Sequence, residues 1–249
     1  MSKPKILVFD IETKPNLVYA WGLWDQNISI GQIVEPSAPI CFSAKFVGEK
    51  EIFFYSDWED GHSEMVKALH GLLMEADAVV TYNGDKFDIP KMRGEFLLEG
   101  LSPLPPLTSI DILKTVRKFG FVSNKLEFIG TFLEIGRKIK NEGFGLWVKV
   151  MNGDAAAQKR MKRYCIGDSV LTEKVYTKLK GHIPNHPHLG EVVSEACGSC
   201  GSHRVQKRGV RRTKSFTIQR LQCQDCGSWS DGARKKITNL PSKPAKEKA

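Results

Sequence analysis

The stretch Val8-Phe9-Asp10-Ile11-Glu12-Thr13 places two acidic residues at the end of an apolar run that begins at Ile6. The run predicts a buried β-strand over residues 5–11, and residues two apart in a strand project from the same face. Two carboxylates ~4 Å apart repel by roughly 4 kcal/mol at an effective dielectric constant near 20. Asp10 and Glu12 therefore require a cation, a shared proton or open water. A strand that ends in a solvated loop is the alternative explanation.

Short apolar runs and stretches of helical spacing make up most of the chain after this strand. Strands come first and strand–helix alternation follows, which predicts an α/β domain with a mixed sheet flanked by helices. The expected strands are residues 17–24, 39–47, 51–55 and 78–82, and the expected helices are residues 62–75, 89–99, 112–119, 125–135 and 155–180.

The expected helix 155–180 carries an acid on its apolar stripe. Asp168 takes a position where a core helix normally has an apolar residue, and Tyr164 lies four residues earlier on nearly the same face. Gly167 adjoins the acid, and we expect another backbone segment to approach there, because a helical glycine costs about 1 kcal/mol relative to alanine. An Asp168 at the helix edge and an ordinary core Tyr164 are the alternative. The stripe consists of Met161, Cys165, Leu171, Val175 and Leu179.

A third acidic position follows the expected strand 78–82. The turn at Asn83-Gly84 leads to Asp88, which precedes a helix that has Pro90 near its first turn. Aspartate is a preferred N-cap residue, so a capping role is the alternative explanation for Asp88. We assign Asp111 as a helix cap only.

Together these segments resemble the three motifs of the DnaQ-like 3′–5′ exonucleases, the DEDD superfamily with a ribonuclease H-like fold. The matching segments are DIET at 10–13, YNGDKFD at 82–88 and YCIGD at 164–168. A tyrosine four residues before the last aspartate is the form that marks the DEDDy branch. The other branch has a histidine five residues before that aspartate, where this chain has Arg163.

Two further segments resemble particular members of this family. The segment Lys125-Leu126-Glu127-Phe128-Ile129-Gly130 is similar to the connecting helix of the DNA-polymerase-type members. The layout that includes VYAWGLWDQNI at 18–28 is similar to phage-encoded members.

The resemblance implies a catalytic site with two divalent ions, Mg²⁺ or Mn²⁺. Asp10 would bridge both ions, and Glu12 would bind one of them and contact the terminal 3′-hydroxyl. Asp168 would hold the ion on the nucleophile side, and Asp88 would support the second ion partly through water. Tyr164 would orient the attacking water, because a phenol is a poor general base at neutral pH.

The expected activity is release of nucleoside 5′-monophosphates from the 3′ end of a nucleic acid. DNA is favoured, either single-stranded or with a 3′ end, and replication or recombination proteins are candidate partners. Asn83 and Phe87 would flank the terminal nucleotide, although core packing is the alternative for Phe87. A structure-specific endonuclease on the same fold and a non-catalytic nucleic-acid-binding factor remain open.

The cysteines gather near the C-terminus in two CxxCG units. Cys197, Cys200, Cys223 and Cys226 suit tetrahedral Zn²⁺, whereas Cys41 and Cys165 are scattered. Four thiolates leave no open position, so the zinc is expected to be structural, in a module that resembles a zinc ribbon. Replacement of one cysteine ligand by His203 is the alternative.

Positive charge is also concentrated in this module. From residue 197 onward the chain has 13 Lys and Arg residues against 3 acidic ones, and the segment between the cysteine pairs predicts a basic hairpin. Lys207, Arg208, Arg211 and Arg212 are candidates for phosphate contact. A merely solvated face and a protein contact are the alternatives.

These patterns predict an exonuclease domain at 1–182, a linker at 183–196, the zinc ribbon at 197–232 and a basic, disordered tail at 233–249. No run approaches 18 apolar residues, so no membrane span is expected. The first residues have no signal-peptide pattern. We therefore expect a cytoplasmic protein, in a bacterial host if it is phage-encoded.

Overall fold

The computed structural model describes residues 4–184, 186–188 and 196–237. The chain divides into two compact units, one spanning Pro4–Leu179 and one that includes the described residues from Lys180 onward. Among the described residues, no helix combines the length and the apolar character that crossing a membrane requires.

The first unit is built on a five-stranded mixed sheet in the order β5-β4-β1-β6-β7. Strand β1 is antiparallel to β4 and parallel to β6, which in turn is parallel to β7. The predicted mixed sheet is therefore confirmed, although β7 was not expected because half of its four residues are polar and exposed. The strands are β1 Ile6–Thr13, β4 Pro39–Phe46, β5 Phe53–Ser56, β6 Ala78–Thr81 and β7 Thr108–Asp111.

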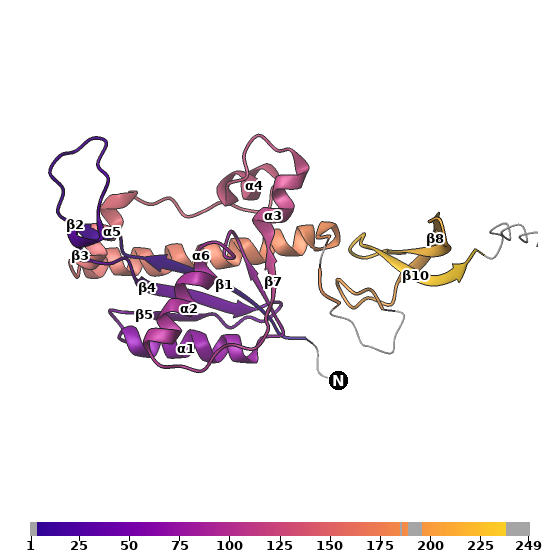
Figure 1. The fold of residues 1–249 in the computed structure, drawn as a ribbon, viewed down its shortest axis with the longest axis horizontal. Coiled ribbons are helices and arrows are strands. Elements are labelled where there is room, and N and C mark those ends of the chain that lie inside the picture. Colours follow the sequence, from indigo (N-terminus) through magenta and orange to yellow (C-terminus); the bar gives the residue numbers. More distant parts are fainter. Residues whose placement is uncertain (1–3, 185, 189–195, 238–249) are drawn as a thin grey trace, which may run out of the picture. The chain divides into compact units, whose positions relative to one another are not determined.

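Helices cover both faces of this sheet (Figure 1). Leu7, Phe9 and Ile11 project into a core formed with α1 (His62–Glu75) and α2 (Asp88–Leu98). The opposite face of β1, which carries the two acids, is covered by the long helix α6 (Ala155–Leu179).

The contact between α6 and the sheet is partly polar. Ser43 on β4 donates a hydrogen bond to the carbonyl oxygen of Cys165 at 2.8 Å, and its hydroxyl lies 2.5 Å from that of Ser169. The stripe predicted for α6 is buried throughout, so the helix and its inward face are confirmed. A Cβ on Gly167 would lie 2.9 Å from Ile139 Cδ1. The segment that approaches this glycine is therefore a side chain, and not the backbone that we expected.

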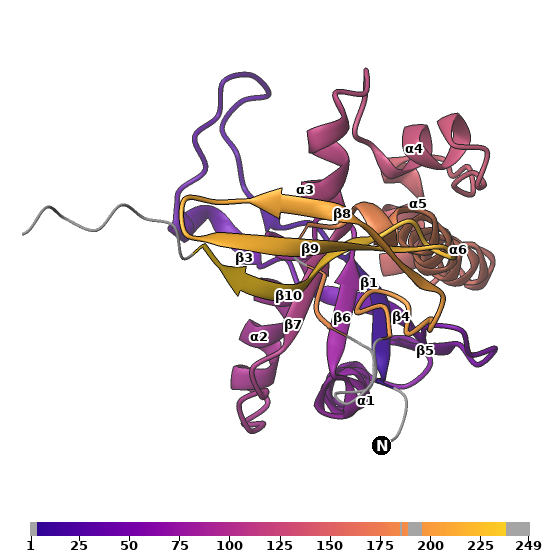
Figure 2. The same cartoon turned by 90° about the vertical axis from the view of Figure 1, so that its right-hand side faces the viewer.

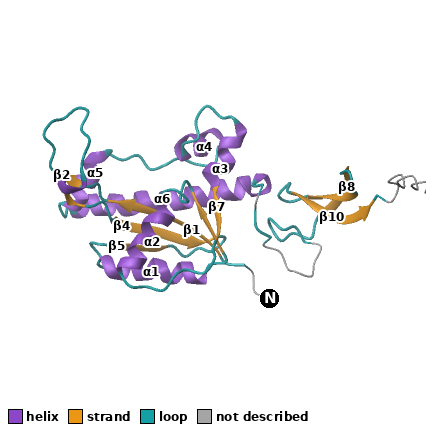
Figure 3. Cartoon of the chain, in the orientation of Figure 1, coloured by secondary structure: helices purple, strands orange, loops and turns teal. Residues whose placement is uncertain are grey.

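Ile139 belongs to a loop of residues 133–143 that joins α4 (Leu126–Phe132) to α5 (Phe144–Met151). Figure 3 shows this loop in teal between the two helices. Helix α5 was not expected, because its aromatic and β-branched residues do not favour a helix. It forms because Leu146 and Val150 bury themselves against α6.

The segment after β1 differs most from expectation. The strand predicted at 17–24 is confined to β2 (Leu17–Val18), which pairs with β3 (Ile33–Glu35). The residues between them form a loop that projects from the unit (Figure 1), followed by the short 3-10 helix Ile30–Gln32. Its aromatic residues suggested a strand, but Trp21 is 99% exposed and pairs with no neighbouring strand among the described residues.

The remaining helices of the first unit match the prediction for residues 112–119. They are α3 (Ile112–Val116) and a 3-10 turn at Arg117–Phe119.

The second unit contains a three-stranded antiparallel sheet in the order β10-β9-β8 (Figure 2). The predicted basic hairpin corresponds to β8 (Val205–Arg212) and β9 (Phe216–Cys223). Strand β10 (Trp229–Lys236) passes the boundary that we expected at residue 232, because its second half pairs with the start of β9. The 3-10 turn Lys180–His182 precedes the expected linker, most of which, like the end of the tail, lies outside the described residues.

Candidate active site

Strand β1 and helix α6 bring three carboxylates together. Oxygen atoms of Asp10, Glu12 and Asp168 all lie within 4.8 Å of one another. The two strand residues share the face that α6 covers, and Asp168 projects from the buried side of that helix, where it is 2% exposed. Residues from the two ends of the unit therefore form one acidic cluster.

Asp88 lies beside this cluster as the first residue of α2. Its Oδ1 accepts a hydrogen bond of 3.1 Å from the backbone N–H of Ile11, the residue between the two β1 acids. The N-cap position belongs to Phe87, so Asp88 does not cap its helix as the alternative proposed. Its charge is near enough to raise the pKa of Asp10.

The turn before α2 has a backbone conformation that few residue types can adopt. Asn83 has a positive φ of 74°, and its N–H donates to Asp111 Oδ1 at 2.8 Å. A Cβ on Gly84 would lie 2.4 Å from the side chain of Thr81, so only glycine fits there. Asp111 also accepts from the N–H at the start of α3, which confirms its assignment as a cap. Phe87 is 39% exposed and lies next to Asp88.

Burial and mutual repulsion perturb the acids. Burial raises the pKa of Asp10 well above its usual value, and the charges of Asp88 and Glu12 add to the effect. Burial, followed by the charge of Asp168, raises the pKa of Glu12 to about 8. Burial raises the pKa of Asp88 to about 6. Without a compensating cation, Glu12 therefore keeps its proton near neutral pH.

A lysine from the loop 133–143 reaches the same cluster. Lys138 Nζ lies 2.7 Å from Asp168 Oδ2 and donates to the Tyr164 hydroxyl at 3.0 Å. Burial lowers the pKa of Lys138, but the nearby Asp168 and Tyr164 raise it by a larger amount. The net shift of the pKa is upward, so the lysine stays charged. Burial raises the pKa of Tyr164 to about 12. No feature of the sequence indicated Lys138, because an irregular loop has no periodicity that orients its side chains.

The acidic cluster fits a divalent cation. Within the part of the chain that the structure describes, Asp168 Oδ1 is buried and has no hydrogen-bond partner, while Oδ2 holds Lys138. Buried polar atoms normally have partners. An unpartnered carboxylate oxygen beside two further carboxylates is the oxygen-rich set that hard divalent cations bind.

The four cysteines of the C-terminal unit form a second ligand set. Their sulfur atoms lie within 4.8 Å of one another, and Cys197–Cys226 and Cys200–Cys223 are each 3.6 Å apart. The glycine after each CxxC has a positive φ, 73° and 75°, which allows the tight turn around the sulfurs. This arrangement fits a tetrahedral metal ion and is compatible with a zinc ribbon. Among the described residues, the cluster does not include His203.

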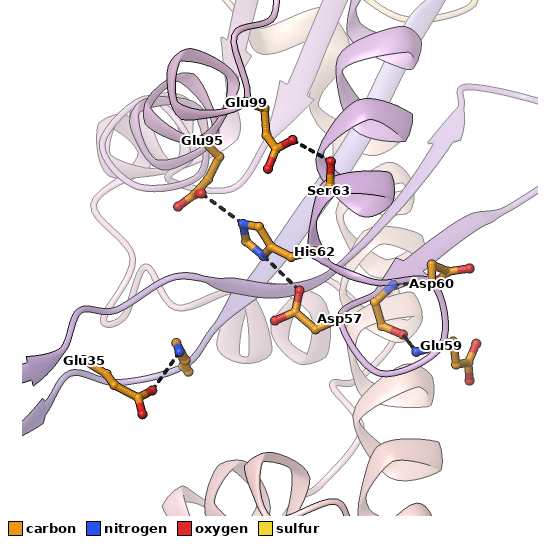
Figure 4. Close-up of polar contacts among 10 residues, drawn as sticks. Glu35, Asp57, Glu59, Asp60, His62, Ser63, Glu95 and Glu99 are labelled. Carbon is orange, nitrogen blue, oxygen red and sulfur yellow. Dashed lines mark hydrogen bonds and ion pairs between the residues drawn. The ribbon is translucent and has the colours of Figure 1, made fainter.

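A histidine holds α2 in place on the side of the sheet away from α6. His62, at the start of α1, lies 2.9 Å from Asp57 Oδ1 and 3.0 Å from Glu95 Oε2 through its two ring nitrogens (Figure 4). Ser63 on α1 donates to Glu99, the residue that follows α2, at 2.5 Å. Burial lowers the pKa of His62, but the two carboxylates raise it by more. Because Asp88 begins α2, these contacts help to position it.

Comparison with known proteins places this fold in a family. A family model described as RNase H superfamily matches residues 7–180. The chain belongs to the RNase H superfamily. Members of this superfamily with nuclease activity use divalent metals, in agreement with the acidic cluster. No curated protein matches the sequence.

A solved structure shows the same RNase H-like fold. The family B DNA polymerase from the hyperthermophilic archaeon Pyrobaculum calidifontis is similar over 72% of this chain, with 13% sequence identity and a TM-score of 0.54. The chain spans only 25% of that polymerase. The likeness is therefore one of fold and concerns one part of the larger enzyme.

Proposed function

We propose that the protein is a metal-dependent 3′–5′ exonuclease of the DEDDy type, which releases nucleoside 5′-monophosphates and prefers DNA. The observation that carries this proposal is the convergence of Asp10, Glu12 and Asp168 within 4.8 Å. Asp88 lies alongside, and Tyr164 lies one helical turn from Asp168. Membership of the RNase H superfamily supports a nuclease, and likeness to a DNA polymerase supports a DNA substrate.

Asp10, Glu12 and Asp168 would be the ligands of two Mg²⁺ or Mn²⁺ ions, and Asp88 would support them. Such a pair supplies an activated water and stabilises the leaving oxygen. Tyr164, with its raised pKa, stays protonated and orients the water by hydrogen bonding. Lys138 contacts both the Tyr164 hydroxyl and the Asp168 carboxylate, and it therefore holds the two groups in place relative to each other.

Substrate binding would involve residues around the cluster and in the second unit. The exposed ring of Phe87 offers a surface on which the terminal base stacks, and Asn83 lies in the turn before it. The four-cysteine cluster would hold one structural Zn²⁺, and the basic sheet around it would bind nucleic acid. The candidates Lys207, Arg208, Arg211 and Arg212 are all exposed on β8.

A nuclease assay tests the proposal. A 5′-labelled single-stranded oligonucleotide with Mg²⁺ or Mn²⁺ should shorten stepwise from its 3′ end, and matched DNA and RNA substrates show which is preferred. Asp10→Ala and Asp168→Ala should abolish hydrolysis, whereas Glu64→Gln, an exposed acid on α1, should not. Full activity in either alanine variant overturns the site, and cleavage of a circular single strand indicates an endonuclease.

A further inference from the structure

Strand register separates the basic side chains of the second unit onto two faces. Directly paired residues of an antiparallel sheet share a face, and faces alternate along each strand. Arg220 pairs with Asp231, Trp229 pairs with Gln222, and Arg211 pairs with Ile218. Since positions 218, 220 and 222 alternate regularly, these residues lie on one face. This Trp229 face consists of Arg211, Phe216, Ile218, Arg220, Gln222, Trp229, Asp231, Arg234 and Lys236.

The opposite face carries different basic residues and borders a cavity. Lys207 pairs with Leu221, and Arg212 and Lys235 both pair with Thr217, so these three cations share the second face. A cavity of about 850 Å³ is lined there by Lys207 and Leu221 together with Ile183 and His188 of the preceding segment. The lining of the same cavity also includes Trp229 and Asp231 of β10.

Aromatic surface and positive charge meet on the Trp229 face. Trp229 is 52% exposed, and the guanidinium carbon of Arg220 lies 5.4 Å from its ring centroid. A hollow of about 430 Å³ adjoins the indole and is bordered by Arg211 and Asp231. This volume falls within the roughly 300–1,000 Å³ that small-molecule ligands occupy.

The charge of this face favours an anion. Its one acid, Asp231, is bound by Arg211 through two hydrogen bonds of 2.6 and 3.1 Å. Arg234 also lies 3.9 Å from this carboxylate, so two arginines share the single negative charge of Asp231. With Arg220 and Lys236, the face carries four cations against one acid. Phe216 is 40% exposed on the same face and adds a second aromatic surface.

We infer that the Trp229 face is a binding site for single-stranded nucleic acid, in which an unpaired base stacks on Trp229 beside Arg220. Phosphates farther along the same strand contact Arg234 and Lys236, which lie toward the other end of β10. Unpaired bases present the flat π surfaces that an exposed indole accepts, whereas a duplex hides them within its base stack. The inference rests on the proposed function for the identity of the ligand as a nucleic acid. It goes beyond that function because it assigns the binding to the Trp229 face, to unpaired rather than duplex nucleic acid, and to stacking on Trp229.

The test compares binding by full-length variants that share the inactivating Asp10→Asn substitution. Fluorescence anisotropy of a labelled single strand and of its duplex is measured for Trp229→Ala, Trp229→Phe, Arg220→Gln and Lys207→Gln. Stacking of one base contributes ~1–3 kcal/mol, so Trp229→Ala should weaken single-strand binding about 5- to 150-fold. Trp229→Phe should restore most of this loss, and duplex binding should change little.

The two charge variants provide the matched control. Arg220→Gln and Lys207→Gln remove the same charge from opposite faces, and Arg220→Gln should cause the larger loss. Unchanged single-strand affinity in Trp229→Ala overturns the inference. An equal loss of single-strand and duplex affinity in Trp229→Ala also overturns it, and so does an equal loss of single-strand affinity in Arg220→Gln and Lys207→Gln. Zinc content of each variant, measured by elemental analysis, shows that the unit is folded.

Failure of this inference is distinguishable from failure of the proposed function. In the presence of an intact Asp10, Trp229→Ala should still shorten a short oligonucleotide from its 3′ end. If that hydrolysis persists while single-strand affinity is unchanged, the stacking site is wrong and the exonuclease proposal stands. If Asp10→Ala protein hydrolyses DNA normally, the proposed function fails regardless of what Trp229 binds.

Discussion

Replacement of Glu12 by glutamine should stabilise the metal-free protein at alkaline pH. The carboxyl of Glu12 has an ordinary pKa of 4.5 and a pKa of about 8 in the folded chain. Between these values the folded protein keeps a proton that the unfolded chain releases, so the free energy of unfolding falls as pH rises. The slope is about 1.36 kcal/mol for each pH unit, and the total loss by the upper end of the interval is at most ~5 kcal/mol.

Glutamine has the shape of the protonated acid but does not titrate. Glu12→Gln and the wild type should therefore be about equally stable near the lower end of this interval and should diverge as pH rises, with the variant more stable by several kcal/mol near its upper end. Adding Mg²⁺ should stabilise the wild type at alkaline pH, because a ligand of the folded state raises its stability. The same addition should have a smaller effect on the variant.

Urea unfolding followed by circular dichroism across this pH interval measures the difference. The protein is dialysed against buffer treated with chelating resin, and its zinc content is checked so that the second unit stays intact. Glu64→Gln, an exposed acid on α1, is the control and should follow the wild type. Parallel pH profiles for Glu12→Gln and the wild type would refute the conclusion that burial and the neighbouring acids raise the pKa of Glu12 in the folded chain.

Other contacts give further expectations. Lys138→Met should lower kcat by more than tenfold and leave KM nearly unchanged. When Lys138→Met is combined with Tyr164→Phe, the fold-loss in kcat should be smaller than the product of the two single fold-losses, because the two residues act as one unit. The pKa of His62 is raised in the fold, so His62→Gln should reduce stability by about 1 kcal/mol below pH 6.5, with a difference that shrinks as pH rises through the folded pKa; urea titrations at several pH values test this. Gly84→Ala should lower stability by about 1–3 kcal/mol through its clash with a threonine side chain, whereas Gly94→Ala on α2, where a Cβ meets nothing within 4 Å, should be neutral or stabilising by thermal unfolding.

Local patterns predicted the parts of the structure that burial dictates. Alternation along β1 placed Asp10 and Glu12 on one face, and the apolar stripe of α6 placed Asp168 on the buried side of its helix. The mixed sheet followed from the order of these elements. Their meeting within one cluster depends on how α6 packs over β1, and only the three-part resemblance indicated it before the structure was known.

Features that depend on tertiary contact were not predictable. Lys138 reaches Asp168 because Ile139 packs against Gly167, and neither residue of that loop belongs to a periodic segment. Helix α5 forms through burial against α6 although its residues favour strands. The segment 17–24 has the composition of a strand, but among the described residues only Leu17 and Val18 of it pair with another strand. In each case packing outweighs local propensity.

The projecting loop between β2 and β3 gives the molecule an optical property. The chain has five tryptophans, and two of them, Trp21 and Trp24, lie on this loop, where they are 99% and 83% exposed. Indoles in water emit at longer wavelengths than buried ones. A partner that binds this loop and shields its indoles from water will therefore shift the fluorescence spectrum to shorter wavelengths. The native chain thus reports contact with this segment without an attached dye.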